Sequence, residues 1–182
     1  MTLRTVWVLF LGVLPFLLSG CGGGAAPDPR TFDLGLEAPG ARIPTVHIGS
    51  VRAIAPFDTP DMQYRLVYRN ATEIATFAHS RWAASPADMF RKQLLRASGD
   101  GAGKCSLDVD IQEFSQVFVA KEASDARIDL RASVRGGASR SVSIVEPNAG
   151  ADAASGAAAV ARAANRAIGE LGAWVGAQPG CR

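Results

Sequence analysis

Alternating apolar and polar residues from Ser106 to Ala120 constrain the fold of this chain more than any other sequence feature. One set of alternate positions holds Leu107, Val109 and Ile111, and the other holds Asp108, Asp110 and Gln112. Successive side chains of a strand point to opposite faces, so the pattern predicts a long β-strand with one buried and one solvated face. The alternation shifts by one residue at Glu113-Phe114, which indicates a β-bulge.

Six further segments have the composition of strands. They are residues 31–36, 46–54, 63–69, 72–77, 128–134 and 139–145. A slip in the pattern near Gly49-Ser50 indicates a second bulge, and Asn70-Ala71 and Gly136-Gly137 have the residue types of hairpin turns.

Two helices are predicted, one on each side of the last three strands. Ser85 suits the N-cap position, Pro86 the first helical position and Asp88 the capping box, and this helix ends near Gly99. The second helix covers residues 152–175 and has an apolar stripe at spacings of three and four. Strands grouped between helices predict an α+β fold, with a mixed, mostly antiparallel sheet and two helices packed on one face.

The first twenty residues predict a secretory signal peptide. The apolar run from Val6 to Leu18 follows Arg4 and is shorter than the roughly 20 residues that a spanning helix needs. It ends in Leu18-Ser19-Gly20-Cys21, which resembles a bacterial lipobox. We therefore expect cleavage after residue 20 and lipidation of Cys21, whose thiolate is the nucleophile that thioether formation requires. The alternative is an ordinary signal peptide with Cys21 left for a disulfide.

The remaining chain divides into three parts. Residues 21–30 are rich in Gly and Pro and predict a tether, residues 31–176 form the folded domain, and residues 177–182 form a C-terminal tail. Residue 22 is Gly rather than Asp. By resemblance to the sorting rule of enteric bacteria, this favours the periplasmic face of the outer membrane, with the inner membrane as the alternative.

Charge and motif content exclude several functions. Nineteen basic and 17 acidic residues give a net charge of +2, without the concentrated basic face of a nucleic-acid binder. The stretch 99–105 resembles a P-loop, but Ser98 stands at the first glycine position and Cys105 replaces the required Ser or Thr. We expect no ATP or other cofactor, and two histidines with scattered cysteines make no recognisable metal site.

Cys105 and Cys181 remain once Cys21 is assigned to the lipid. An exported compartment is oxidising, so we favour a disulfide between them. The alternative is two unrelated thiols, one of them in a loose C-terminal tail.

Asp108 and Asp110 share one strand face and could in principle form a catalytic carboxylate pair. A solvated face opposite the apolar residues explains them better. The sequence thus predicts no catalytic residues, and we expect a protein that is not an enzyme.

Several segments together resemble the ABC-type transport auxiliary lipoprotein family. They are the lipobox Cys21, Thr31-Phe32-Asp33-Leu34-Gly35, the strand 46–56 ending at a proline, Asp61-Met62-Gln63-Tyr64-Arg65, and Phe77-Ala78-His79-Ser80-Arg81-Trp82-Ala83. The resemblance covers residues 31–174. Phe77 stands where the family usually has Tyr, and residues 58–60 interrupt a segment where the family often has Leu-Asp.

The resemblance implies a non-catalytic docking component of an MCE-type (mammalian cell entry) lipid transport system. Its partners would be an MCE-domain protein with the associated ABC permease and ATPase, and the membrane through the lipid anchor, and self-association stays open. As partner-binding residues we name Met62, Arg65, Arg81 and Trp82. Arg65 or Met62 is favoured over Tyr64, and Arg81-Trp82 could equally serve to fix the corner between strand and helix.

Other function classes remain open at this stage. The main alternative is a stand-alone periplasmic lipid carrier with a pocket between the sheet and the helices. A hydrolase that uses Asp108 and Asp110 and a lipoprotein that assists outer-membrane assembly are weaker alternatives.

Overall fold

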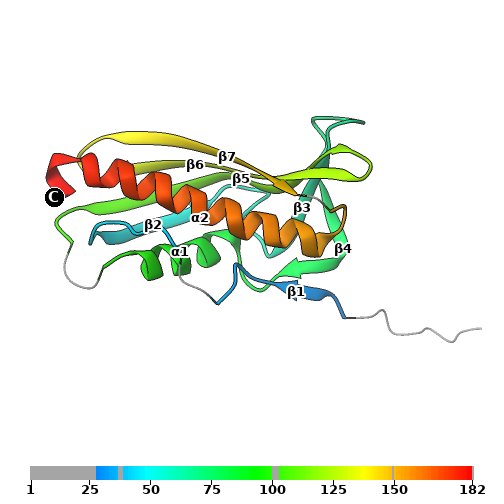
Figure 1. The fold of residues 1–182 in the computed structure, drawn as a ribbon, viewed down its shortest axis with the longest axis horizontal. Coiled ribbons are helices and arrows are strands. Elements are labelled where there is room, and N and C mark those ends of the chain that lie inside the picture. The colour runs from blue at the N-terminus through cyan, green and yellow to red at the C-terminus, as the bar shows by residue number, and fades with distance from the viewer. Residues whose placement is uncertain (1–27, 37–38, 100–102, 149, 182) are drawn as a thin grey trace, which may run out of the picture.

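A computed structural model describes residues 28–36, 39–99, 103–148 and 150–181. Within this part of the chain, one seven-stranded sheet carries both helices on the same face (Figure 1). The predicted signal peptide, Cys21 and most of the predicted tether lie outside the described residues. The α+β fold class expected from the order of strands and helices is confirmed.

The sheet is built around its longest strand. In chain order the strands are β1 (Arg30–Phe32), β2 (His47–Ala53), β3 (Asp61–Leu66), β4 (Ala75–Trp82), β5 (Ser106–Ala120), β6 (Ala123–Val134) and β7 (Ser139–Asn148). Their order in space is β1-β4-β3-β5-β6-β7, and β2 also pairs with β5.

β5 is long enough for two strands to share one of its edges. The first half of β5 pairs in parallel with β2, with Val51 opposite Val109, and the second half pairs in parallel with β3, with Gln63 opposite Ser115. On its other edge β5 pairs antiparallel with β6 along its whole length. This arrangement extends the sheet well beyond the usual strand length of about five or six residues.

The pairing directions and both predicted bulges agree with the sequence. Among the described strands, three pairings are parallel and three antiparallel, and the longest are the antiparallel β5–β6 and β6–β7 pairings. The β2 register shifts between Ile48 and Val51, and the β5 register shifts between Ile111 and Glu113. Each shift keeps the apolar residues of its strand on one face of the sheet.

Both helices begin with the side-chain caps that their sequences allow. In α1 (Pro86–Ala97) the Ser85 hydroxyl accepts a hydrogen bond from the Asp88 backbone N–H. In α2 (Ala153–Ala177) the Asp152 carboxylate accepts from the N–H groups of Ala154 and Ser155, at 2.8 and 2.9 Å. Such caps satisfy backbone donors that have no partner inside the helix.

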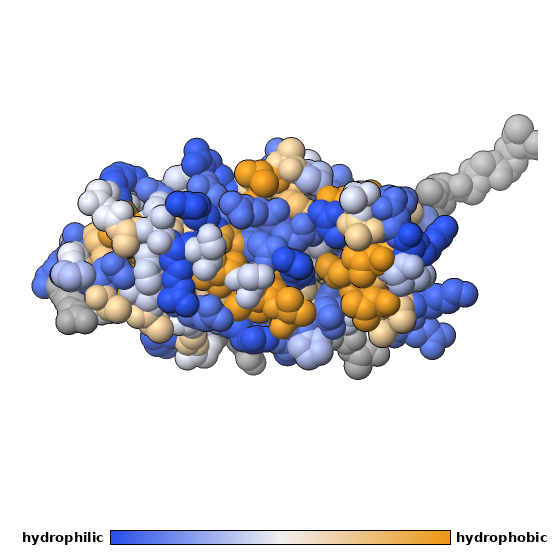
Figure 2. All heavy atoms as spheres, turned by 90° about the horizontal axis from the view of Figure 1, so that it is seen from above, coloured by the Kyte–Doolittle hydropathy of each residue, from blue (hydrophilic) through white to orange (hydrophobic). Residues whose placement is uncertain are grey.

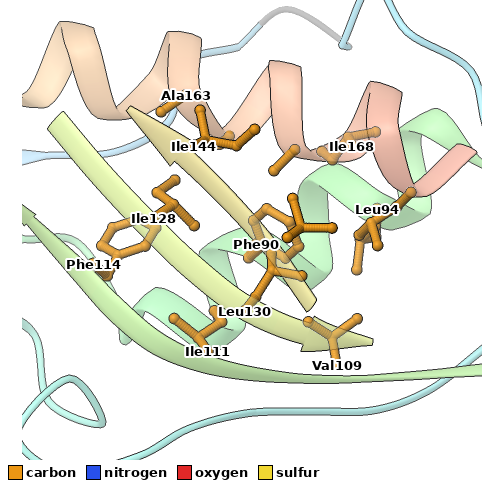
Figure 3. Packing of buried hydrophobic residues seen from close by; sticks show 14 of the residues in the cluster. Phe90, Leu94, Val109, Ile111, Phe114, Ile128, Leu130, Ile144, Ala163 and Ile168 are labelled. Carbon is orange, nitrogen blue, oxygen red and sulfur yellow. The ribbon is translucent and has the colours of Figure 1, made fainter. Parts of the chain in front are cut away.

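The core lies between the two helices and the sheet (Figure 3). α1 contributes Phe90 and Leu94, α2 contributes Ile168, and the strands contribute Ile111 and Ile128, all fully buried. α2 packs mainly against β6 and β7, and α1 packs mainly against β2. Alanines on the buried side of α2 let this helix lie close to the sheet.

Two boundaries differ from the sequence prediction. A two-residue turn at Asn70-Ala71 was expected, but β4 begins only at Ala75 and continues to Trp82. At the C-terminus, where a tail was expected from residue 177, α2 runs to Ala177 and a 3₁₀ helix follows it at Pro179–Cys181, so the alternative of a loose tail is wrong. A disulfide joins Cys181, which is buried, to Cys105 just before β5, over a sequence separation of 76 residues.

Candidate partner-binding surface

The sheet has a second face that neither helix covers, which we call the open face. It is formed by the side chains of β2, β3, β5, β6 and β7 that alternate with the core residues. Four arginine–carboxylate ion pairs lie on it: Arg52–Asp110, Arg65–Glu113, Arg127–Asp129 and Arg135–Asp108. Each of these four pairs is neutral as a whole, and its two side chains hold each other in place.

The most enclosed of these pairs joins β3 to β5. Arg65 Nε and Nη2 donate to the two carboxylate oxygens of Glu113 at 3.0 and 2.9 Å, and both side chains are largely buried (21% and 12% exposed). The Ser115 hydroxyl also donates to Glu113. A two-point contact between guanidinium and carboxylate fixes both direction and distance, so this pair is rigid compared with ordinary surface pairs.

Asp108 and Asp110 share the open face, as the alternation predicts, but each interacts with its own arginine. Asp110 pairs with Arg52 at 3.0 Å, and Asp108 pairs with Arg135 at 3.3 Å. Asp108 also accepts a hydrogen bond from the Ser50 backbone N–H at 2.7 Å. This backbone hydrogen bond, assisted by Arg135, lowers the pKa of Asp108 below its ordinary value. A carboxylate held ionised in this way is a poor general acid.

A shallow pocket of about 320 Å³ lies on the open face around the Arg65–Glu113 pair. Its lining joins this pair to the second ion pair, Arg127–Asp129, and to the apolar side chains of Val67 and Val117. Asp129 is further fixed by the Ser143 hydroxyl, which donates to it at 2.6 Å. The pocket thus combines two oriented ion pairs with the apolar contact area of the two valines.

Of the four residues predicted to bind a partner, the structure places two at the surface and two in the core. Arg65 lies on the open face, and Arg81 is exposed on β4. Met62 and Trp82 were wrongly assigned, because each is only 2% exposed and belongs to the core. Trp82 stacks edge-on against Phe114 at a centroid distance of 5.5 Å, so it fixes the corner before α1 rather than presenting a surface.

Sequence reasoning missed Glu113, Arg127 and Asp129, which complete the pocket around Arg65. Arg127 and Asp129 alternate with Ala126, Ile128 and Leu130 along β6, so their outward direction could have been predicted. Their closeness to Arg65 could not, because it depends on the order of strands across the sheet.

Two other pockets lie away from the Arg65–Glu113 pair. One, of about 210 Å³, lies between α1 and the segment after β1 and includes Leu34 and Met89. The other, of about 590 Å³, lies by the disulfide and is lined in part by His47, Lys104 and Arg135. Pockets for drug-sized ligands have roughly 300–1,000 Å³. The apolar pocket is smaller than this range, and the larger pocket has a cationic lining.

The described residues include no cluster of three or more histidine, cysteine or acidic side chains that could hold a metal ion. Among the helices in the described part of the chain, none has the length and apolar character needed to cross a membrane. Seen from above, the molecule is mostly hydrophilic, with hydrophobic residues gathered in separate patches (Figure 2).

Two solved structures share this fold. Protein XCC0632 from Xanthomonas campestris, assigned to the family DUF330, superposes with a TM-score of 0.61 at 21% sequence identity, over 78% of this chain and 94% of that chain. An uncharacterized protein superposes with a TM-score of 0.61 at 11% identity, over 81% of this chain and 99% of that chain. No family model and no curated protein matches the sequence. At these identities the likeness establishes a common fold.

Proposed function

We propose that this chain is a membrane-anchored periplasmic lipoprotein that serves as a non-catalytic docking component of an MCE-type ABC lipid transport system. The observation that carries the proposal is the open face, a broad charged surface of the sheet that no helix covers in the described structure. Arg65 and Glu113 hold each other at its centre in a two-point contact. A surface whose charged groups are already oriented loses little side-chain entropy when a partner binds.

Anchoring would act by raising local concentration. A lipid on Cys21 and the short tether after it would keep the domain close to the membrane, so that docking becomes an effectively intramolecular event. The Cys105–Cys181 disulfide supports export, because disulfides persist in oxidising compartments. The DUF330 fold supports the resemblance to the auxiliary lipoprotein family only at the level of architecture.

The size of the pockets favours docking over lipid carriage. A two-chain lipid is larger than a drug-sized ligand, and the apolar pocket beside α1 measures about 210 Å³. Both helices are packed on the sheet through fully buried side chains such as Phe90 and Ile168, which fill the layer where a carrier would hold its lipid.

Co-purification from membranes tests the docking role. The full-length protein is expressed in its native host, extracted in mild detergent and captured, and associated proteins are identified by mass spectrometry. We expect an MCE-domain protein with the wild-type chain and at least a tenfold loss with Arg65→Glu. Lys92→Glu makes the same charge change at an exposed position on α1 and should behave like wild type. If wild type recovers no MCE-type component, the proposed function is wrong.

Lipidation is tested separately. Cys21→Ala should abolish incorporation of labelled palmitate and move the protein from the membrane fraction to the soluble periplasmic fraction. The described fold does not include Cys21, so the midpoint of thermal unfolding of the domain should stay unchanged. Continued membrane association with no label would contradict the anchor.

A further inference from the structure

β7 is an edge strand, and its two halves differ. It pairs antiparallel with β6 on one side, and no other described strand pairs with it on the other side. In an antiparallel pair, alternate residues direct their N–H and C=O groups away from the neighbouring strand. Val145 and Pro147 belong to the outward set, because their carbonyls accept hydrogen bonds from Arg166 (3.0 Å) and Arg162 (2.9 Å) of α2.

The second half of the β7 edge is closed to another strand. Arg162 and Arg166 occupy its outward carbonyls, and Glu146 holds both arginines at 2.9 and 2.8 Å. Pro147 has no N–H to offer a neighbouring strand. Arginines and a proline at the edge prevent strand addition there.

The first half of the same edge is unprotected. By the alternation that Val145 and Pro147 establish, the outward residues here are Ser139, Ser141 and Ser143. All three are exposed, and no side chain of the described chain bonds to their outward backbone groups. The Ser143 hydroxyl donates to Asp129 and the Ser139 hydroxyl accepts from Arg131, so both side chains are held on the open face and leave the edge uncovered.

We propose that Ser139–Ser143 pairs with the same segment of a second copy of this chain, antiparallel about a twofold axis at Ser141. Ser141 would then face Ser141 of the copy, and Ser139 would face Ser143. Each of these three pairs joins outward residues and can exchange two backbone hydrogen bonds, about six in total. The two sheets become one continuous sheet, and the contact is the self-complementary kind that closed dimers use.

A second copy fits this edge because the unprotected half of the β7 edge is as long as the segment that the copy would pair with it. In this register the copy's β7 begins opposite Ser143, and the chain before it turns away through Gly136, whose φ is +74°. It therefore leaves the edge just before Val145, where the arginine caps begin. A longer strand from another protein would run into those caps.

The spacing and charge of α2 also fit a twofold pair. Neighbouring strands lie about 4.8 Å apart, and α2 lies over β6 and β7, so the two copies of α2 would be about 10 Å apart, close to the usual packing distance of helices. Arg140 and Glu170 form a half-exposed ion pair at 3.8 Å beside this edge. The Arg140–Glu170 pairs of the two copies would meet near the twofold axis, where Arg140 of each copy can pair with Glu170 of the other.

Cysteine cross-linking tests the register. In the full-length protein under oxidising conditions, Ser141→Cys should give a disulfide-linked dimer, because opposite residues lie about 5.5 Å apart between Cα atoms. Ser139→Cys alone should give none, since the two copies of residue 139 are four positions, or about 13 Å, apart along the strands. Mixing Ser139→Cys with Ser143→Cys should restore the cross-link. Equal cross-linking at all three positions would overturn the twofold register.

A proline pair tests the hydrogen bonds. Ser141→Pro removes one outward N–H and should shift the mass measured by light scattering from dimer to monomer, with the dimer dissociation constant raised at least tenfold. Val145→Pro removes an outward N–H beyond the paired segment and should leave the dimer intact. Circular dichroism checks that both variants fold. A wild-type protein that is monomeric at every concentration, with no Ser141→Cys cross-link, would overturn the proposal.

Discussion

The two faces of the sheet are built from the same strands by different physics. On β6, Ile128 is fully buried under the helices, while its neighbour Arg127 is half exposed on the open face and pairs with Asp129 at 2.8 Å. The face that the two helices cover, which we call the covered face, is stabilised by burial of apolar area. This stabilisation does not depend on the direction of the contacts. The open face is organised by ion pairs that contribute little to stability but fix the orientation of each charge. Apolar packing and charge orientation are thus assigned to opposite sides of one strand.

The largest expected effect separates these two roles at adjacent positions. Ile128→Ala removes buried methyl groups from the centre of the core and should lower the free energy of unfolding by about 2–5 kcal/mol. Arg127→Ala should lower it by at most about 1 kcal/mol. Urea denaturation followed by circular dichroism measures both. Similar losses for the two variants would break the distinction between the faces.

The division between faces is the part of the fold that the sequence predicts best. Alternation depends on neighbouring residues, so it identified the buried side of β5 and both bulges, at Gly49-Ser50 and at Glu113. It could not predict that β2 and β3 share one edge of β5, because strand order depends on contacts between residues far apart in the chain.

The candidate site was predicted only in part, for the same reason. Arg65 was identified as outward from its own strand, but its partner Glu113 lies 48 residues away and is reached only through the β3–β5 pairing. Met62 and Trp82 were misjudged although large apolar side chains are usually buried. They were named because they lie in segments that carry the family resemblance. A short motif does not indicate which of its side chains face the core.

A second prediction tests how closely the covered face is packed. A Cβ added at Gly172 of α2 would lie 2.5 Å from the backbone carbonyl oxygen of Arg42, whereas one at Gly176 would meet Pro44 at an ordinary 3.5 Å. Gly172→Ala should therefore destabilise the protein by about 1–3 kcal/mol. Gly176→Ala should be neutral or stabilise it by up to about 1 kcal/mol, because alanine favours helix. Thermal unfolding compares the two, and a stabilising Gly172→Ala would show that the covering segment is loose.

A third prediction sharpens the comparison within the open face. Arg65→Ala leaves Glu113 largely buried without its charged partner and should cost about 1–2 kcal/mol. Arg52→Ala removes an arginine that is 71% exposed and pairs with Asp110, so it should change stability by less than about 0.5 kcal/mol. Denaturant titrations at low and high salt measure both losses. Equal values would mean that the Arg65–Glu113 pair is no more rigid than the outer pairs.

The smallest effect concerns acid stability, to which two carboxylates beside α2 contribute. Hydrogen bonds from Arg166 and Arg162 lower the pKa of Glu146, and the backbone N–H groups of Ser155 and Ala154 lower the pKa of Asp152. Because folding lowers these pKa values, the folded state gains stability above the ordinary carboxylate range near pH 4 and loses it as the pH falls further.

Glu146→Gln should therefore lower the free energy of unfolding at pH 7 by about 0.5–1 kcal/mol, and its effect should become smaller as the pH falls below the ordinary carboxylate range near pH 4. Denaturant titrations at a neutral and an acidic pH measure the difference. A Glu146→Gln variant that loses equal stability at both pH values would show that the side chain acts by packing rather than by its charge.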